Sequence, residues 1–141
     1  MLRATRPAGR QLSAQTLGVS SREGENALMA GIVSAAAENK ETRREFLDGS
    51  TRSHALLRSV AVGVGVYQPG WRWSLHAGPQ TGRPSENHVG YVVSGAMMIQ
   101  DTKGREQQVE PGFAFEIEAG GDAWVVGSRP CTALDFIPLE Q

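Results

Sequence analysis

Two histidines, His76 and His88, are the side chains of this 141-residue chain best suited to chemistry. His76 ends the segment PGWRWSLH and His88 begins the segment HVGYVVSG, with a polar stretch rich in glycine and proline between them. Imidazole is a common ligand of transition metals, and a pKa near neutrality also suits it to act as a general base. The pair is therefore a candidate metal site, and His88 is also a candidate acid–base catalyst.

A metal site at these histidines would need further ligands. Catalytic metal sites use about three protein ligands and leave a position open for water or substrate. Glu86 lies two residues before His88 and would share a strand face with it, and Asp122 is a second candidate. Without such a ligand, the two imidazoles would be interior side chains with hydrogen-bond partners, lining a pocket. The residues alone leave both alternatives open.

The elements that must position these residues are short strands. From about residue 53 onward, apolar stretches rich in valine, isoleucine and aromatic residues alternate with the turn signals PG, TKG, GG and RP. This spacing is typical of an all-β sandwich or barrel. The sequence DTKG at 101–104 predicts a hairpin turn between strands at 97–100 and 106–109, with Gly104 at positive φ.

The chain before the strands divides into two parts. Residues 1–22 contain four arginines and no acidic or aromatic residue, which resembles a transit peptide in composition but favours a flexible tail. Residues 23–44 predict a short amphipathic helix or arm, which must dock on something because a helix this short is marginal alone. The β-barrel domain is expected over 45–141. The apolar residues at helical spacing are Leu28, Met29, Ile32, Val33 and Ala36.

Alternation along the predicted strands selects the side chains that face the interior. Trp71 and Trp73 would face outward, and because large exposed apolar patches are uncommon on monomers, this predicts a homodimer. Arg72 would either bind a ligand carboxylate or pair with Glu86 at the barrel mouth. The side chains expected to line a small-molecule pocket are Arg72, Ser74, His76, His88 and Val92.

The segment from 70 to 95 resembles the first sequence motif of the cupin superfamily. In that motif a glycine is followed by five residues and the first of two histidines, and later by a glutamate, six residues and a glycine. Gly70 and His76 match the opening. His88 stands at the position of the glutamate, six residues before Gly95, and Gly78 stands at the position of the second histidine.

The segment from 112 to 123 resembles the second cupin motif in spacing, with Ala123 where the family has its last histidine. The resemblance covers about residues 40–138 and is to small single-domain bacterial cupins. It implies a single jelly-roll barrel with a small-molecule pocket inside. It also implies a divalent metal such as iron, zinc, manganese or nickel, held by His76 and His88, with Glu86 as the third ligand expected from its position beside His88. The incomplete motif leaves a metal-free barrel as the alternative.

The resemblance leaves open whether the protein is an enzyme. One reading is a binding protein with His76 and His88 in its pocket. A second is a metal-dependent cupin enzyme of the dioxygenase or isomerase type. A third is a metal-free enzyme in which His88 acts as a general base.

Composition argues against several other classes of function. A net charge of -1 gives no basic surface for nucleic acid. No apolar run approaches the ~20 residues that a membrane helix needs. The one cysteine, Cys131, cannot form an intrachain disulfide, so a cytoplasmic protein is expected.

Overall fold

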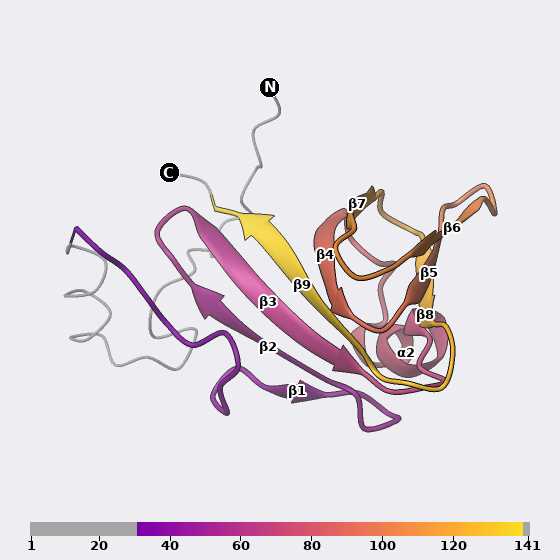
Figure 1. The fold of residues 1–141 in the computed structure, drawn as a ribbon, viewed down its shortest axis with the longest axis horizontal. Helices are drawn as coiled ribbons and strands as arrows, with labels where there is room; N and C mark the ends of the chain where they lie inside the picture. The colour runs from indigo at the N-terminus through magenta and orange to yellow at the C-terminus, as the bar shows by residue number, and fades with distance from the viewer. Residues whose placement is uncertain (1–30, 140–141) are drawn as a thin grey trace.

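The computed structural model describes residues 31–139, which fold almost entirely into antiparallel strands (Figure 1). The expectation of an all-β protein is confirmed. The elements in chain order are β1 (Arg44–Glu45), β2 (Thr51–Leu56), β3 (Val60–Tyr67), the π-helical turn η1 (Trp73–Ala77), α2 (Gly78–Thr81), β4 (His88–Ser94), β5 (Met97–Gln100), β6 (Glu106–Val109), β7 (Ala114–Ile117), β8 (Asp122–Val125) and β9 (Cys131–Pro138).

The strands form two sheets. The larger has the order β1-β2-β3-β9-β4-β7 and the smaller the order β6-β5-β8. In the middle of the larger sheet, β3 and β9 pair along their whole length, from Val60 opposite Pro138 to Tyr67 opposite Cys131. The smaller sheet lies on the side of β4 and β7 (Figure 1). Strands distant in sequence are thus neighbours, as the jelly-roll expectation requires.

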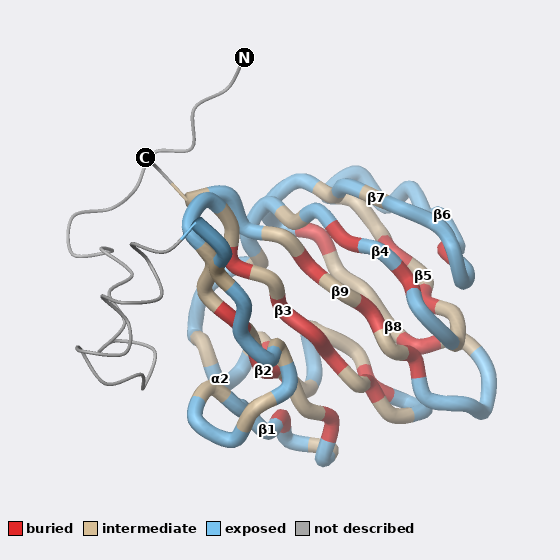
Figure 2. Tube along the Cα trace, turned by 60° about the vertical axis from the view of Figure 1, so that its left-hand side comes forward, coloured by how far each residue is buried: buried red, intermediate tan, exposed pale blue. Residues whose placement is uncertain are grey.

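Side-chain alternation separates an inner from an outer face. On β4, Gly90 and Val92 are buried, whereas Val89 and Tyr91 are exposed, so the expected inward face is confirmed there. Ser94 does not continue this inward face, because the register shifts between Val92 and Ser94 and Ser94 is exposed. Figure 2 shows the corresponding buried positions along β3 and β9.

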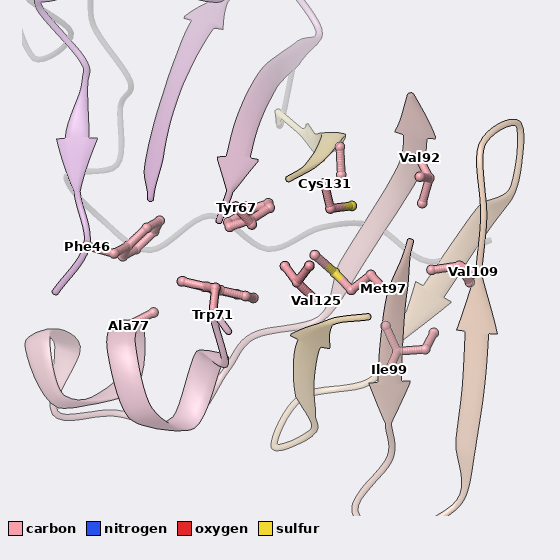
Figure 3. Close-up of a cluster of buried hydrophobic side chains, with 11 residues drawn as sticks. Phe46, Tyr67, Trp71, Ala77, Val92, Met97, Ile99, Val109, Val125 and Cys131 are labelled. Atoms are coloured by element: carbon pink, nitrogen blue, oxygen red, sulfur yellow. The ribbon is translucent and has the colours of Figure 1, made fainter. Parts of the chain in front are cut away.

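The core joins both sheets to the helical segment. Tyr67 and Trp71 lie between Phe46 and the side chains of Met97 and Val125 (Figure 3), with the Tyr67 and Trp71 ring centroids 4.3 Å apart. Trp71 is therefore a core residue, which corrects the prediction that it faces outward. The buried cluster comprises Phe46, Tyr67, Trp71, Ala77, Val92, Met97, Ile99, Val109, Val125, Cys131 and Ala133.

The hairpin predicted at residues 101–104 is confirmed. Gly104 has a φ of 83°, and Met97–Gln100 pairs with Glu106–Val109. The Asp101 carboxylate accepts the backbone N–H groups of Lys103 and Arg105, both at 2.9 Å. This Asx-type turn closes the hairpin without tertiary help, which is why the local sequence predicts it well.

The expected helix over 23–44 does not extend into the described residues. Residues 31–44 form bends, a turn and the start of β1. The Asn39 amide donates to the carbonyls of Ala36 and His54, and its oxygen accepts the backbone N–H of Thr42. Such side-chain bonds offer the backbone an alternative to a helix. Residues 23–30 and the predicted tail at 1–22 lie outside the described residues. No helix in the described part is long and apolar enough to cross a membrane.

Candidate functional site

His76 lies in a helical turn and not in a strand. After β3 the chain turns at residues 69–70, with Gly70 at a φ of 90°. Arg72 is extended and bridges to Trp124, and the chain then enters η1. The Nδ1 atom of His76 accepts the backbone N–H of Arg72 at 2.9 Å, and the His76 backbone N–H donates to the Arg72 carbonyl. The expected strand alternation from Arg72 to His76 is therefore wrong. The His76 ring stabilises the first turn of its own helix.

Asp122 of β8 holds this turn in place. Its carboxylate accepts the Arg72 Nε–H at 2.8 Å and both the backbone N–H and the hydroxyl of Ser74. The Arg72 guanidinium also lies over the Trp124 ring, 4.1 Å from its centroid. Burial acts to raise the pKa of Asp122, but the hydrogen bonds from Ser74 and Arg72 outweigh it and lower that pKa. Arg72 thus pairs with Asp122 and not with Glu86.

A cavity of about 390 Å³ occupies the barrel interior. Aromatic and aliphatic side chains from both sheets form much of its wall, and charged groups interrupt them. Of the predicted pocket residues, His88 lines the cavity and so does Glu86, the predicted third ligand; His76, Arg72, Ser74 and Val92 do not. Charged and imidazole side chains that line it are Arg44, Arg52, Arg83, Glu86, His88, Asp122 and Asp135.

An ion pair between Arg52 and Asp135 forms the buried polar part of this wall. Arg52 Nε donates to Asp135 Oδ2 at 2.8 Å and Nη2 donates to Oδ1 at 2.7 Å. Asp135 is 5% exposed. Gly63 of β3 lies between the two strands, and a Cβ there would stand 2.9 Å from Arg52 Cζ, so the absence of a side chain makes room for the pair. Burial lowers the pKa of Arg52, but Asp135 raises it further, and the guanidinium stays charged.

His88 stands at the start of β4 with its ring stacked on Phe115, at a centroid distance of 5.8 Å. Burial lowers its pKa, and the charge of Asp135 opposes that shift in part. The imidazole is therefore neutral at neutral pH. Among residues 31–139, no side chain or backbone group forms a hydrogen bond with its ring nitrogens, which leaves one donor and one acceptor for a ligand.

The residues present do not fit a divalent metal. His76 already uses Nδ1 to accept a hydrogen bond, and Gly78 and Ala123, at two of the family's ligand positions, have no ligand atom. Glu86 lies in the loop before β4 and is exposed, so it does not share a strand face with His88. Within the described part of the chain, no group of three or more His, Cys, Asp or Glu side chains is placed to hold an ion.

Sequence reasoning missed Arg52 and Asp135. Two signals pointed to them. An aspartate in the apolar stretch CTALDFIP falls on the same face as Cys131 and Ala133, and a buried acid requires a partner. Alternate glycines in VGVGVY indicate close approach of another group to one face of a strand. Neither signal identifies Arg52 as the partner of Asp135, because the two residues lie 83 positions apart in the sequence.

No family model and no curated protein matches the sequence. Several solved structures are similar in fold. KdgF from Halomonas sp. is 18% identical, with a TM-score of 0.52, over 70% of this chain and 88% of that one. A sugar phosphate isomerase of the cupin superfamily from Silicibacter pomeroyi is 22% identical, with a TM-score of 0.52, over 69% of this chain and 70% of that one.

A protein of unknown function from Vibrio parahaemolyticus gives a TM-score of 0.53 at 15% identity, over 72% of this chain and 98% of its own. Identities this low carry the fold and not the activity. They agree with the antiparallel two-sheet topology. The protein is a small chain with the fold of the cupin superfamily.

Proposed function

We propose that this small cupin binds a small organic molecule inside its barrel, in contact with His88 and the Arg52–Asp135 pair. The supporting observation is the cavity of about 390 Å³, which combines an apolar wall with a few convergent polar groups. Small-molecule sites are typically roughly 300–1,000 Å³ and have this composition.

The ion pair supports a binding role more than a purely structural one. Buried ion pairs contribute little net stability, because removing two charges from water offsets their attraction. The Arg52 guanidinium has five N–H donors, of which two are engaged by Asp135. Arg52 and His88 both line the cavity. A ligand that bonds to them would offset the cost of burying the pair.

The proposal requires no metal. A second candidate is an enzyme in which His88 acts as a general base, as the sequence suggested. The lowered pKa of His88 favours it, because a base must be unprotonated at the working pH. In the binding protein and in the enzyme alike, the His88 ring would contact the ligand directly. Turnover of a substrate would distinguish the enzyme from the binding protein.

Filling the cavity provides the test. Ala123 lines the cavity, whereas Ala114 in β7 is exposed, so Ala123→Leu and Ala114→Leu add the same atoms inside and outside. Small molecules are extracted from each purified full-length protein and identified by mass spectrometry. A molecule that accompanies the parent chain and Ala114→Leu but not Ala123→Leu is the expected result. Equal amounts in both variants would contradict the proposal.

The homodimer stays a prediction, and the tryptophans do not support it. Trp71 is buried and Trp73 lines the cavity, so neither forms an outer patch. The exposed apolar side chains of β4 are instead Val89, Tyr91 and Val93 on its outer face. Light scattering of the full chain measures the mass and tests the prediction directly.

A further inference from the structure

One row of residues across the larger sheet brings two arginines and a tyrosine together on the cavity wall. Arg44 of β1 lies directly opposite Arg52 of β2, and Arg52 lies directly opposite Gly65 of β3. Side chains directly opposite each other in antiparallel strands project from the same face of the sheet. Arg44, Arg52 and Tyr67 all line the cavity. The two arginines therefore share the inner face of the sheet.

The Tyr67 side chain occupies the third place in this row. A Cβ at Gly65 would clash with the hydroxyl and Cζ atoms of Tyr67, so the phenol lies over Gly65 and next to Arg52. Phe46 and Trp71 pack against the ring, with centroid distances of 6.2 and 4.3 Å (Figure 3). The hydroxyl is thus held in a fixed place beside the arginines.

The Tyr67 hydroxyl is available to a ligand. Among residues 31–139, no hydrogen bond engages it, and Trp71 Nε1 is the only buried side-chain polar atom without a partner. The hydroxyl is therefore accessible, and because Tyr67 lines the cavity, it opens onto that space. Burial raises the pKa of Tyr67, so the hydroxyl keeps its proton at neutral pH and can donate a hydrogen bond.

The positive charge of the row is only partly neutralised. Like charges directly opposite each other destabilise a sheet. Asp135 accepts hydrogen bonds from Nε and Nη2 of Arg52, which leaves the other edge of that guanidinium unpaired. Arg44 forms no ion pair within the described chain, and the adjacent Glu45 belongs to the opposite face of the sheet. Glu86 also lines the cavity, but it comes from the loop before β4.

We infer that Arg44, Arg52 and Tyr67 form an oxyanion subsite of the cavity, which binds the carboxylate or phosphate group of a small organic ligand. This inference rests on the proposed function and names the chemical group by which the ligand is recognised. A deprotonated oxyanion offers only acceptor atoms, which match the N–H and O–H donors of the subsite. It also supplies the negative charge that the facing arginines lack.

Probes that share a phenyl ring and differ in charge test the subsite. The full-length protein is titrated by calorimetry with phenylacetate, with phenyl phosphate and with the neutral phenylacetamide. At least one anion should bind about tenfold more tightly than phenylacetamide, because hydrogen bonds to charged groups are stronger than neutral ones. The tighter anion identifies the preferred group. Its affinity should fall as ionic strength rises, because Arg44 is exposed and salt screens its charge.

Tyr67→Phe removes one oxygen atom and keeps the ring. It should lower the affinity for the tighter anion by about tenfold and change that for phenylacetamide little. Loss of packing would lower both affinities together, so the ratio of anion to amide affinity is the decisive quantity. Tyr91→Phe is the matched control, because Tyr91 is exposed on the outer face of β4 and does not line the cavity. It should leave the ratio unchanged.

Arg44→Gln tests the charge at the exposed end of the row. It should lower the same ratio by about two- to fivefold, as expected for a partly screened charge, and make the affinity for the anion less sensitive to salt. Arg105→Gln removes an exposed charge outside the cavity and should leave the ratio unchanged. Arg52 is kept in both variants, because its removal would leave the buried Asp135 carboxylate unpaired.

Three outcomes would contradict the subsite. Anions that bind no more tightly than phenylacetamide, with every probe weakened by Ala123→Leu, would overturn it and leave the proposed function standing. A ratio that neither Tyr67→Phe nor Arg44→Gln changes would place the anion elsewhere and overturn it as well. If no anion binds at millimolar concentration, the subsite is overturned, whereas the extraction experiment still decides the proposed function.

Discussion

Arg52 and Asp135 form a two-point ion pair across the inner face of the larger sheet, with nitrogen–oxygen distances of 2.8 and 2.7 Å. Arg52 comes from β2 and Asp135 from β9, and β3 lies between these strands. The side chain of Arg52 is 25% exposed and that of Asp135 only 7%. The two charges are thus desolvated unequally, and their removal should have unequal consequences.

Arg52→Ala should destabilise the protein more than Asp135→Ala. Removing the arginine leaves a buried carboxylate unpaired, which costs about 3–5 kcal/mol. Removing the aspartate leaves a guanidinium that can turn toward solvent, so the loss should be smaller. Urea unfolding measures both free energies.

The Arg105–Asp101 pair provides the matched control. It has the same nitrogen–oxygen distance of 2.7 Å, but the Arg105 side chain is 72% exposed. Solvent screening makes such surface pairs weak, so Arg105→Ala should leave the free energy of unfolding nearly unchanged. Equal losses for Arg52→Ala and Asp135→Ala would show that the difference in burial does not govern the pair.

Gly63→Ala should disrupt the same pair by steric conflict. A Cβ at position 63 would clash with Asp135 Oδ1, its nearest atom, and would lie 2.5 Å from Arg52 Nη2 and 2.9 Å from Cζ. Overpacking of this kind costs about 1–3 kcal/mol in the free energy of unfolding, measured in urea. Because part of the conflict involves Arg52, the cost should shrink in part in an Arg52→Ala background, and a double-mutant cycle detects this coupling. Gly31→Ala, with no atom within 4 Å, is the control.

Features of the fold that depend on residues close together in the sequence could be predicted, whereas features that depend on contacts between distant residues could not. The hairpin at Gly104 and the inward face of β4 follow from residues close in sequence, and both are confirmed. The placement of His76 is wrong because the chain turns into a helix where Asp122, 48 residues from Ser74, accepts the Ser74 N–H. Local alternation contains no information on that contact.

The candidate site was predictable in part for the same reason. His88 lines the cavity and begins β4, whose side chains alternate regularly from His88 to Val92. Arg52 and Asp135 meet only through the order of strands β2, β3 and β9, which no local pattern specifies. The resemblance of motifs predicts the barrel and places His88 in it, whereas the Arg52–Asp135 pair of the cavity lies outside those motifs.

Removal of divalent metal should leave the protein unchanged. The described residues hold no group of three potential ligands, and His76 Nδ1 is engaged by the Arg72 N–H. Treatment with a chelator should therefore alter neither the thermal midpoint nor the binding of a cavity ligand. Thermal unfolding with and without chelator, beside metal analysis of untagged protein, measures this. A stoichiometric metal whose content falls in His76→Ala or His88→Ala would contradict it.

The stability of the protein should fall in mildly acidic solution because of His88. Burial lowers its folded-state pKa, so below the ordinary value of 6.5 the unfolded chain binds a proton that the folded chain does not. The free energy of unfolding should then decrease as pH falls from 6.5 toward the lower folded-state pKa, by at most about 1.4 kcal/mol per pH unit. Urea unfolding across this range should give a flatter profile for His88→Gln. His54, whose pKa burial also lowers, remains in both proteins and supplies the common background. If the free energy of unfolding changed with pH in the same way in the parent protein and in His88→Gln, the pKa of His88 would not be lowered by folding.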